Sequence, residues 1–433
     1  MSLSNNLIVN KSRPLVGKIK IPGDKSISHR SIILGSLSEG ELVVSNFLNS
    51  DDCLSTINAM RDLGVEIHLD NDKVKIVGKG LYGLNKPKSI IDVGNSGTLI
   101  RLLTGLLSAQ KFQSSITGDK SIVKRPMARV IKPLVANGAR IESENYMAPI
   151  QIYPSDSIDV FNYTQEIASA QVKSCLILTA LYTGEISKFF EKIPTRDHTE
   201  NLLEHFNVRI KREHNSFEFL GRQNLVAKDI EIGSDISSAA FFIVAALIVN
   251  QSNLSFKNIN INRYRTGIIT VLREMGANIT ITNIRTISNE QVGDIQVKHS
   301  ELKSINIDGE IIPSLIDELP ILFIACAHAS GTSTIKGIEE LRYKESDRIK
   351  SMEDGLRAIG IDVTSTNDSI KITGSKIHGG KVDSSDDHRI AMSFAIAGLV
   401  SEHSMTITNT KNIRTSFPSF VSLLREQGAE IFE

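Results

Sequence analysis

The chain has 433 residues, more than one hydrophobic core usually serves, so the sequence predicts at least two domains. Lys plus Arg and Asp plus Glu number 49 each, and this balance leaves no general field that would attract nucleic acid or an anionic membrane. The longest apolar run, residues 239–249, is too short to span a bilayer, and the N-terminus lacks the pattern of a secretion signal. We therefore expect a cytoplasmic protein without nucleic-acid or membrane partners.

Cysteine and histidine usage predicts neither a disulfide framework nor a metal site. The three cysteines are far apart in the sequence and form no CxxC pair: Cys53, Cys175 and Cys326. Two of them, Cys175 and Cys326, fall inside apolar helical runs, where a buried and inert thiol is expected. The ten histidines include no H-E-x-x-H pattern. We therefore expect no bound metal.

A pattern of amphipathic helix, small turn and β-branched strand recurs six times along the chain. The residues at the turns are Gly64, Gly138, Asn207, Gly276, Gly360 and Gly428, at intervals of 74, 69, 69, 84 and 68 residues. Glycine suits this position because the residue after a helix often needs a positive φ, and asparagine is the usual second choice. The period is longer than a typical solenoid repeat, so each copy is predicted to be a small βα unit.

Each copy also carries a more apolar helix, expected at residues 30–38, 98–108, 172–181, 238–249, 319–329 and 389–400. These helices are apolar on nearly every face and should be buried. Polar residues precede each of them and should gather on one face of a domain. Three copies before about residue 235 and three after it predict two pseudo-symmetric domains, 22–234 and 1–21 plus 235–433. The strand at residues 15–21 is assigned to the second domain because the last copy needs a closing partner.

Residues 21–30 form the first candidate site, a cationic turn between a strand and an apolar helix. Backbone N–H groups and the helix dipole favour an anion there, and Lys25, Ser26 and Arg30 add charge and a hydroxyl. The spacing differs from that of a Walker A loop. The alternative is a solvated basic helix start capped by Ser26 or Ser28.

Two further candidates precede helices in the first half of the chain. Asn95 and Gly97 lie in a small-residue turn whose backbone a carboxylate or phosphate can approach closely, although a turn with Ser96 or Thr98 as the helix cap is the plainer interpretation. Arg125, between Lys124 and a proline, precedes a helix. Because the helix dipole disfavours a cation at this end, the two cations indicate a bound anion that would offset the cost.

The stretch Ser169-Ala170-Gln171 offers a hydroxyl and an amide that suit the hydroxyls of a sugar-like ligand, but polar residues before a helix are also common caps. Asp317 lies beside a buried helix and is either a general base or a carboxylate that stabilises the helix start.

Residues 342–348 are the densest charged stretch. If this stretch is helical, Lys344 and Arg348 lie on one face and repel each other unless a ligand anion intervenes; a surface ladder with Glu345 and Asp347 is the alternative. His388 and Arg389 then precede another buried helix, and His388 either titrates near neutrality or orients a neighbour.

The candidate cations stand at corresponding ends of the repeated units: Lys25, Arg30, Arg125, Lys344, Arg348 and Arg389. In a chain without net charge, this pattern predicts a ligand with several negative charges. Asp317 and Glu345 are available beside the cations for proton transfer. A non-catalytic repeat scaffold that binds an anionic partner is the alternative from another functional class.

Six stretches resemble, in this order, the EPSP synthase family of 3-phosphoshikimate 1-carboxyvinyltransferases: P-G-D-K-S-I-S-H-R, G-N-S-G-T, K-R-P-M, S-A-Q-V-K-S, R-Y-K-E-S-D-R and D-D-H-R-I-A-M. The resemblance implies an α/β fold, the inverse α/β barrel of enolpyruvyl transferases, with two domains of three βαβαββ units each and the substrates between them. It implies transfer of the enolpyruvyl group of phosphoenolpyruvate to the 5-hydroxyl of shikimate 3-phosphate, without metal or organic cofactor. We expect a monomer that glyphosate inhibits in competition with phosphoenolpyruvate.

The resemblance also implies roles for individual residues. Shikimate 3-phosphate would contact Lys25, Ser26, Arg30, Ser169, Ala170, Gln171, Asp317 and Lys344. Phosphoenolpyruvate would contact Lys25, Asn95, Gly97, Arg125, Gln171, Arg348 and Arg389, with His388 in support. Asp317 would accept the hydroxyl proton, Glu345 would exchange a proton with the methylene carbon, and Lys25 would assist the departure of phosphate.

The chain departs from other members of the family at several positions and resembles its second class. Thr415 stands where some members have a lysine, and Thr195 and His198 stand where others have a serine and a tyrosine on the shikimate side. The related UDP-N-acetylglucosamine enolpyruvyl transferases are the nearest alternative. They carry a reactive cysteine in the loop that corresponds to residues 120–124, where this chain has none.

Overall fold

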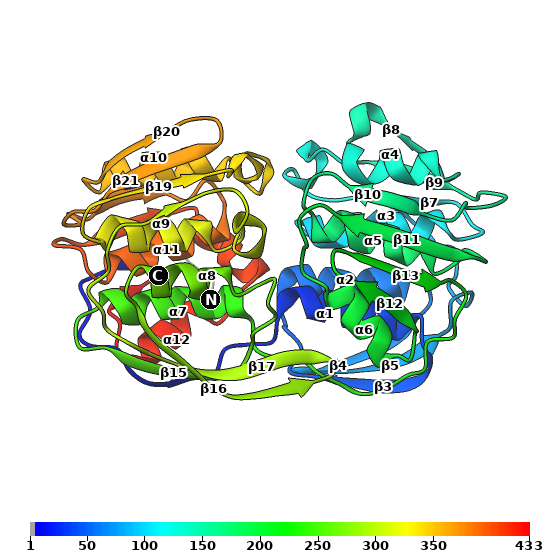
Figure 1. Cartoon of the computed structure of the whole chain (residues 1–433), viewed down its shortest axis with the longest axis horizontal. Helices are drawn as coiled ribbons and strands as arrows, with labels where there is room; N and C mark the ends of the chain where they lie inside the picture. The colour runs from blue at the N-terminus through cyan, green and yellow to red at the C-terminus, as the bar shows by residue number, and fades with distance from the viewer. Residues whose placement is uncertain (1–4) are drawn as a thin grey trace. The chain divides into compact units, whose positions relative to one another are not determined.

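The computed structural model describes residues 5–433, which form two compact units (Figure 1). The N-unit comprises Gly23–Gly233 and Thr286–Glu290, and the C-unit comprises the chain up to Pro22, Ser234–Arg285 and Gln291–Glu433. The sequence placed the two crossings at 21/22 and 234/235, whereas the chain crosses at 22/23 and 233/234. The short segment Thr286–Glu290, which groups with the N-unit, was not expected.

The N-unit contains three four-stranded sheets of one design. The first two strands of each sheet are parallel, and the remaining neighbours are antiparallel. In spatial order the sheets are β14 (Ile230–Glu231), β3 (Glu39–Ser45), β5 (Lys73–Lys79), β4 (Glu66–Asp70); β6 (Ile91–Asp92), β7 (Ser114–Thr117), β9 (Ile150–Tyr153), β8 (Arg140–Ser143); and β10 (Asn162–Gln165), β11 (Ile186–Glu191), β13 (Ser216–Leu220), β12 (Ile210–Glu213).

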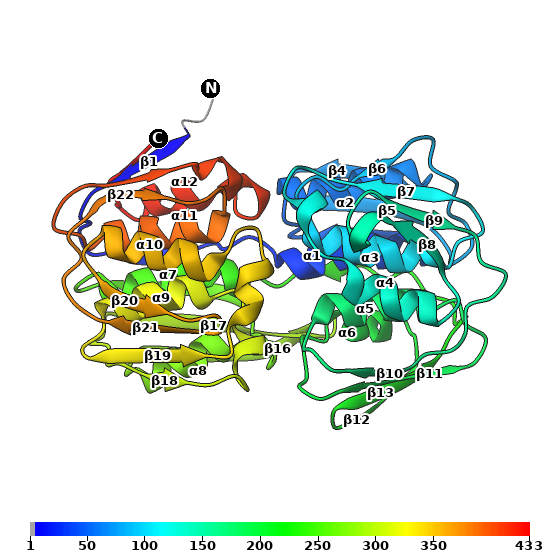
Figure 2. The same cartoon turned by 90° about the horizontal axis from the view of Figure 1, so that it is seen from above.

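Two kinds of helix alternate along the N-unit. The buried helices are α1 (Lys25–Ser36), α3 (Gly97–Ser108) and α5 (Ala170–Ala180), and the amphipathic ones are α2 (Asp51–Asp62), α4 (Ala128–Ala136) and α6 (His198–His205). Two 3-10 turns, η1 (Ile122–Lys124) and η2 (Glu144–Tyr146), complete the unit. Figure 2 shows α3 and α5 inside the N-unit, with strands outside them. A parallel strand pair needs a crossover connection, and the buried helix supplies it in two of the three N-unit sheets: α3 joins β6 to β7, and α5 joins β10 to β11.

The C-unit repeats this design. Its sheets are β2 (Val16–Ile19), β15 (Asn253–Asn260), β17 (Glu290–Lys298), β16 (Asn278–Ile287); β18 (Asn306–Ile307), β19 (Thr332–Lys336), β21 (Ser369–Thr373), β20 (Asp362–Ser365); and β22 (Gly380–Asp383), β23 (Met405–Thr408), β1 (Asn6–Val9), β24 (Ile431–Phe432). The buried helices are α7 (Ile236–Ile248), α9 (Leu319–His328) and α11 (His388–Gly398), and the amphipathic ones are α8 (Gly267–Glu274), α10 (Arg348–Ala358) and α12 (Phe420–Glu426). The 3-10 turns are η3 (Ile312–Ser314), η4 (Glu339–Tyr343) and η5 (Thr410–Thr415).

The expected α/β fold of two sets of three βαβαββ units is therefore confirmed, with an exchange of strands where the chain crosses. β2 precedes α1 in sequence but pairs with β15 of the C-unit, and β14 precedes α7 but pairs with β3 of the N-unit. β1 supplies an inner strand of the last sheet, between β23 and β24. The chain termini and the crossing segments thus complete sheets that would otherwise lack a strand.

The six turns between amphipathic helices and strands have the predicted backbone. The φ angles are +89° at Gly64, +93° at Gly138, +69° at Asn207, +97° at Gly276, +89° at Gly360 and +92° at Gly428. Each of these angles lies in the left-handed region that glycine adopts readily and asparagine tolerates. The choice of residue at the repeat therefore follows from the geometry of the helix end.

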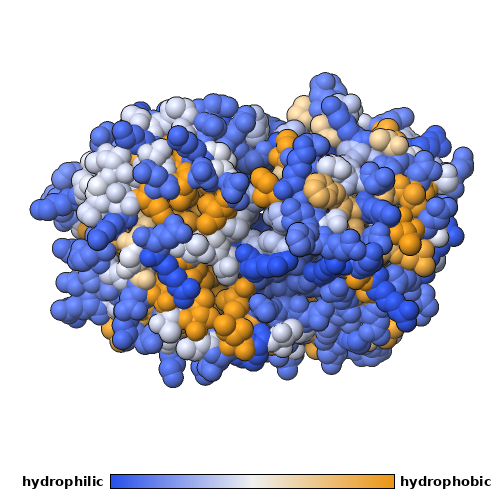
Figure 3. Space-filling model, viewed as in Figure 1, coloured by the Kyte–Doolittle hydropathy of each residue, from blue (hydrophilic) through white to orange (hydrophobic). Residues whose placement is uncertain are grey.

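None of the helices in residues 5–433 combines the length and the apolar character that a membrane span needs. On the face shown in Figure 3, apolar residues lie in separate groups among hydrophilic ones. Most of the large apolar side chains instead form one buried cluster inside each unit.

Candidate active site

The start of α1 presents Lys25 beside a carboxylate. Asp24 caps this helix by accepting the backbone N–H of Ile27 at 2.9 Å, so the expected cap by Ser26 or Ser28 was wrong. Lys25 is the first helical residue, and its Nζ lies 3.0 Å from Oδ2 of Asp52 in α2. The Lys25 side chain is 18% exposed, so the ammonium is held in place but is still accessible.

Arg30 lies one turn further into α1 and is buried, with 1% exposure. Its guanidinium donates to Oγ1 of Thr199 and Oγ of Ser174, both at 2.7 Å, to Oε1 of Gln171 at 3.2 Å and to the carbonyl of Ser26 at 3.0 Å. All four acceptors are uncharged. Burial, together with the neighbouring Arg196, lowers the pKa of Arg30 to about 10. A bound anion would relieve this unfavourable environment.

Arg196 was missed by the sequence reasoning. Its Nη1 lies 3.3 Å from Oγ of Ser26, and its charge acts on Arg30. The repeat contained the signal that could have found it. Arg125 stands in the loop before α4, and Arg196 occupies the corresponding loop before α6.

The start of α3 brings together Asn95, Gly97 and Arg125. Ser96 caps the helix by accepting the N–H of Leu99 at 3.2 Å, as the plainer interpretation expected. Nη2 of Arg125 lies 3.4 Å from Oδ1 of Asn95, and a Cβ at Gly97 would come within 2.5 Å of Nη1 of Arg125. The absence of a side chain at position 97 therefore leaves room for the guanidinium over the helix start.

Gln171 connects the starts of the three buried helices. Its Oε1 accepts from Arg30 in α1, and its Nε2 donates to Oγ1 of Thr98 in α3 at 3.2 Å. Ser169 caps α5 through a bond from the N–H of Val172 at 3.4 Å, and Ala170 follows as the first helical residue. The sequence-predicted residues of the N-unit thus lie at three adjacent helix starts.

In the C-unit, Asp317 lies just before α9 and beside two cations. Its Oδ1 is 3.9 Å from Nζ of Lys344, and its backbone carbonyl accepts from Nη1 of Arg389 at 2.7 Å. Asp317 is therefore surrounded by positive charge at the start of a buried helix.

Arg348 pairs with two carboxylates. Its Nε lies 2.7 Å from Oδ2 of Asp387, its Nη2 lies 3.3 Å from Oδ1 of the same residue, and Nη2 also lies 2.6 Å from Oε2 of Glu345. Burial alone would lower the pKa of Arg348, but Asp387 and Glu345 outweigh it and raise the pKa. The guanidinium is thus kept charged and oriented.

The predicted helical face that would carry both Lys344 and Arg348 was wrong. Lys344 follows η4 in an extended conformation, and α10 begins only at Arg348, after the cap Asp347. Lys344 is itself the extended residue, and its side chain lies beside Asp317 instead. Arg348 is buried, so a surface ladder is excluded too.

The remaining positions have internal partners. His388 is the buried first residue of α11, next to the cap Asp387. The hydroxyl and N–H of Thr195 both bond to Oε1 of Glu191, Nδ1 of His198 lies 2.7 Å from Oε1 of Glu290, and the hydroxyl of Thr415 donates to the carbonyl of Asn412 at 2.7 Å.

The three cysteines are buried, and burial raises the pKa of each thiol. They therefore lack the thiolate character of a reactive cysteine. Within residues 5–433, no group of three or more His, Cys, Asp or Glu side chains is placed to hold a metal ion.

Comparison with known proteins identifies a family over nearly the whole chain. The sequence model of the family described as EPSP synthase (3-phosphoshikimate 1-carboxyvinyltransferase) matches residues 9–424. A protein of Ruthia magnifica named 3-phosphoshikimate 1-carboxyvinyltransferase is 46% identical over 429 residues, which cover 99% of each chain. A protein of the same name from Methylococcus capsulatus is 47% identical over 96% of this chain and 95% of its own.

Solved structures agree with the sequence comparison. A structure of EPSP synthase from Acinetobacter baumannii superposes with a TM-score of 0.88 at 43% identity, and the match covers 99% of this chain and 100% of that one. The sequence, the fold and the arrangement of groups at the helix starts lead to the same conclusion. The chain belongs to the EPSP synthase family.

Proposed function

We propose that this chain transfers the enolpyruvyl group of phosphoenolpyruvate to the 5-hydroxyl of shikimate 3-phosphate and releases phosphate. The main support is the full-length match to relatives named for this reaction. The site adds a physical reason, since cations and hydroxyls gather at the helix starts of the N-unit, and the C-unit combines cations with two carboxylates. Such a set suits two substrates that carry phosphate and carboxylate groups.

For shikimate 3-phosphate, we propose contacts with Lys25, Ser26, Arg30, Ser169, Ala170, Gln171, Asp317 and Lys344. Two N-unit members of this set, Ser26 and Gln171, accept from Arg30, whose acceptors are all uncharged. An anionic group of the substrate would supply the charge partner that these acceptors do not provide. The amide of Gln171 and the hydroxyl of Ser169 suit the ring hydroxyls.

For phosphoenolpyruvate, we propose contacts with Lys25, Asn95, Gly97, Arg125, Gln171, Arg348 and Arg389, with His388 in support. Guanidinium groups match carboxylate and phosphate oxygens in a bidentate way, and Arg348 is already oriented by Asp387. The bare backbone at Gly97 allows the ligand to approach the N-terminus of α3.

The reaction then follows as addition and elimination. Asp317 takes the proton of the 5-hydroxyl while the hydroxyl oxygen bonds to C2 of phosphoenolpyruvate and Glu345 protonates the methylene carbon. This gives a tetrahedral intermediate. Loss of a proton from the new methyl group to Glu345 and departure of phosphate, assisted by Lys25, form the enol ether product. The cations stabilise the negative charge along the path.

One coupled assay distinguishes this reaction from the alternatives. Phosphate release from phosphoenolpyruvate is measured with shikimate 3-phosphate, with UDP-N-acetylglucosamine, or with neither. We expect release only with shikimate 3-phosphate. Release only with UDP-N-acetylglucosamine would favour the related transferase, and no release with either acceptor would favour the non-catalytic scaffold.

We further propose that the enzyme acts as a monomer in the cytoplasm. Three buried free thiols suit a reducing compartment. Light scattering during size-exclusion chromatography should give the mass of one chain, and a concentration-independent dimer would contradict the proposal.

A further inference from the structure

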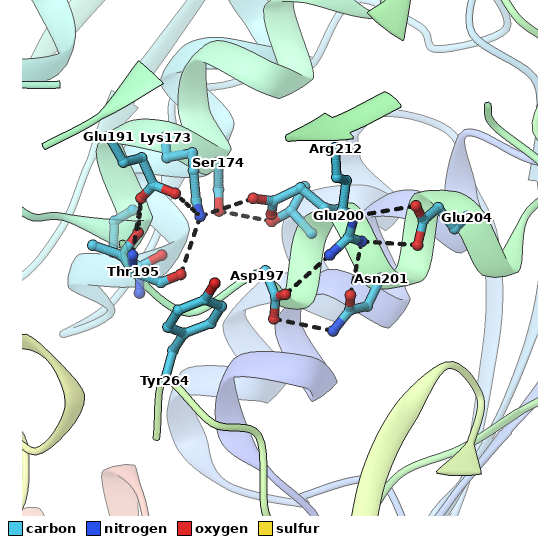
Figure 4. A network of polar contacts seen from close by, with 12 residues as sticks. Lys173, Ser174, Glu191, Thr195, Asp197, Glu200, Asn201, Glu204, Arg212 and Tyr264 are labelled. Atoms are coloured by element: carbon cyan, nitrogen blue, oxygen red, sulfur yellow. Dashed lines mark hydrogen bonds and ion pairs between the residues drawn. The ribbon is translucent and has the colours of Figure 1, made fainter. Parts of the chain in front are cut away.

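A group of three buried charges lies in the N-unit (Figure 4). Nζ of Lys173, in α5, lies 2.9 Å from Oε2 of Glu191 at the end of β11 and 2.8 Å from Oε1 of Glu200 in α6. All three side chains are buried, and Lys173 is only 2% exposed. We call Lys173, Glu191 and Glu200 the buried triad.

The charges of the buried triad are strongly coupled. Burial alone would lower the pKa of Lys173, but Glu200 and Glu191 outweigh it and raise the pKa. Burial raises the pKa of Glu200, against the effect of Lys173. A buried ion triad contributes little to stability in general, because desolvation of the charges offsets their attraction. Its presence beside the candidate site therefore calls for a role other than holding the fold together.

Two members of the triad are adjacent in the chain to residues that accept hydrogen bonds from Arg30. Lys173 precedes Ser174, and Glu200 follows Thr199; the hydroxyls of Ser174 and Thr199 both accept from Arg30 and bond to each other at 2.7 Å. Ser174 and Thr199, which orient Arg30, are therefore each joined through the backbone to a member of the triad.

The triad also holds the backbone before Arg196. Nζ of Lys173 donates to the carbonyl of Thr195 at 3.2 Å, and Oε1 of Glu191 accepts the N–H of Thr195 at 3.0 Å. On the other side of Arg196, Oδ2 of Asp197 lies 3.0 Å from Nη1 of Arg212 (Figure 4). Arg196 is thus carried by a loop that is held at both ends.

The electrostatics agree with this arrangement. Burial and then repulsion from Arg196 lower the pKa of Arg30, whereas Glu200, Asp24 and Glu290 raise it. Of the triad, Glu200 therefore partly offsets the positive charge around Arg30 while no substrate anion is bound. The two arginines can therefore stay close together before the substrate arrives.

We infer that Lys173, Glu191 and Glu200 are positioning residues that hold Arg30 and Arg196 as a preformed clamp for an anionic group of shikimate 3-phosphate. This inference rests on the function proposed above. Phosphoenolpyruvate has no part in the clamp. Disturbing the triad should therefore weaken the use of one substrate and spare the other.

The test compares two lysine variants. Lys173→Met removes the ammonium of the triad. Lys192→Met is the control: Lys192 follows Glu191 in the chain, but its side chain is 55% exposed and pairs with Glu166 at the surface. Both variants lose the same charge and gain the same side chain. Initial rates are measured with each substrate varied in turn, and the titration of the free enzyme with shikimate 3-phosphate is followed by calorimetry.

We expect Lys173→Met to raise the KM for shikimate 3-phosphate about tenfold, the usual effect of a lost charge-assisted hydrogen bond, and to weaken calorimetric binding to the same extent. The KM for phosphoenolpyruvate should change by less than about twofold on the same scale. Lys192→Met should behave as the parent. A merely structural role of the triad would lower the active fraction, and so the apparent kcat, without this split between the two KM values.

Glu191→Gln keeps the test decisive if Lys173→Met does not fold. In glutamate, one oxygen accepts from Lys173 and the other from Thr195. In glutamine one of these oxygens becomes an NH2 donor, so either the bond to Lys173 or the bond to Thr195 is lost while the side-chain volume is kept. Equal KM values for shikimate 3-phosphate in the folded variants and the parent would overturn the inference. An inactive parent would instead contradict the proposed function, so the two failures are distinguishable.

Discussion

Replacing Asp387 with asparagine removes one charge from a buried ion pair of the C-unit. Asp387 and Arg348 are 0% and 1% exposed, and their closest atoms are 2.7 Å apart. Removing one partner of such a pair costs about 3–5 kcal/mol of unfolding free energy, because the other charge stays buried. Asparagine can still accept the backbone N–H of Arg389 and cap α11, and Glu345 still contacts Arg348. We therefore expect a loss of about 3 kcal/mol, at the lower end of that range.

Asp347→Asn is the matched control. Asp347 also caps a helix, α10, by accepting the N–H of Lys350 at 3.0 Å, and it also pairs with an arginine, Arg342, at 2.7 Å. This second pair is partly exposed to solvent, with 22% exposure at Arg342 and 40% at Asp347, and exposed ion pairs contribute at most about 1 kcal/mol. The two substitutions differ mainly in the burial of the arginine that is left behind.

Urea unfolding followed by far-UV circular dichroism measures the difference, since the chain has no tryptophan to serve as a fluorescent probe. Hydrogen exchange of the α11 amides reports the local effect. If Asp387→Asn is no less stable than Asp347→Asn, the assigned strength of the buried pair is wrong.

The pH dependence gives the same test a second readout. Burial would raise the pKa of Asp387, but Arg348 outweighs it and the pKa is lowered. A carboxylate with a lowered pKa in the folded state contributes stability above its unfolded pKa, about 4, and loses it as the pH falls. The difference between the parent and Asp387→Asn should therefore be full at neutral pH and narrow below about pH 4. A difference that is independent of pH would contradict this account.

Three further predictions test the site and the repeat. Lys25→Met should reduce kcat at least about 100-fold with an unchanged circular dichroism spectrum, since it removes a general acid or charge at the reacting phosphate, and equal turnover would refute that role. Gly97→Ala should raise the KM for phosphoenolpyruvate and weaken inhibition by glyphosate, because the new Cβ would lie 2.5 Å from Nη1 of Arg125 and displace the guanidinium. A variant as sensitive to glyphosate as the parent would count against the proposed role of Gly97 in the phosphoenolpyruvate site. Gly428→Ala meets no atom within 4 Å but has a φ of +92°, so thermal unfolding should show a loss of about 1 kcal/mol from backbone strain alone, and no loss would mean that the turn relaxes.

Features that depend on neighbouring residues were predictable. The buried helices begin within about five residues of the predicted starts, and the turn residues have positive φ, since helix ends are set by local hydrogen bonding and steric limits. The candidate binding residues of the N-unit were predictable for the same reason, because they are marked by their position beside helix starts. Asn95, Gly97 and Gln171 precede or begin helices, and a helix start directs its polar groups to one end.

Features that depend on distant residues were missed or wrong. Arg196 is significant only because α6 packs near Ser26, 170 residues earlier. Lys344 reaches Asp317 because Lys344 is itself extended and α10 begins only at Arg348, and helical spacing alone could not show this. Asp24, and not Ser26 or Ser28, caps α1, although aspartate and serine both suit the position.

By itself the sequence determined the period of the repeat, the two kinds of helix and the cationic helix starts, because each is written in residues that are close along the chain. The sequence assigned the strand at residues 15–21 to the second domain as a closing partner for its last copy, but this strand, β2, pairs with β15 of another sheet, and β1 completes the last one. Only the tertiary structure decided this pairing and that of β14 with β3. It also decided that Arg348 is held by Asp387, and that Lys173, Glu191 and Glu200 form a buried triad. These are pairings between segments tens to hundreds of residues apart. Their energies depend on burial and on the removal of water, which exist only once the chain has folded.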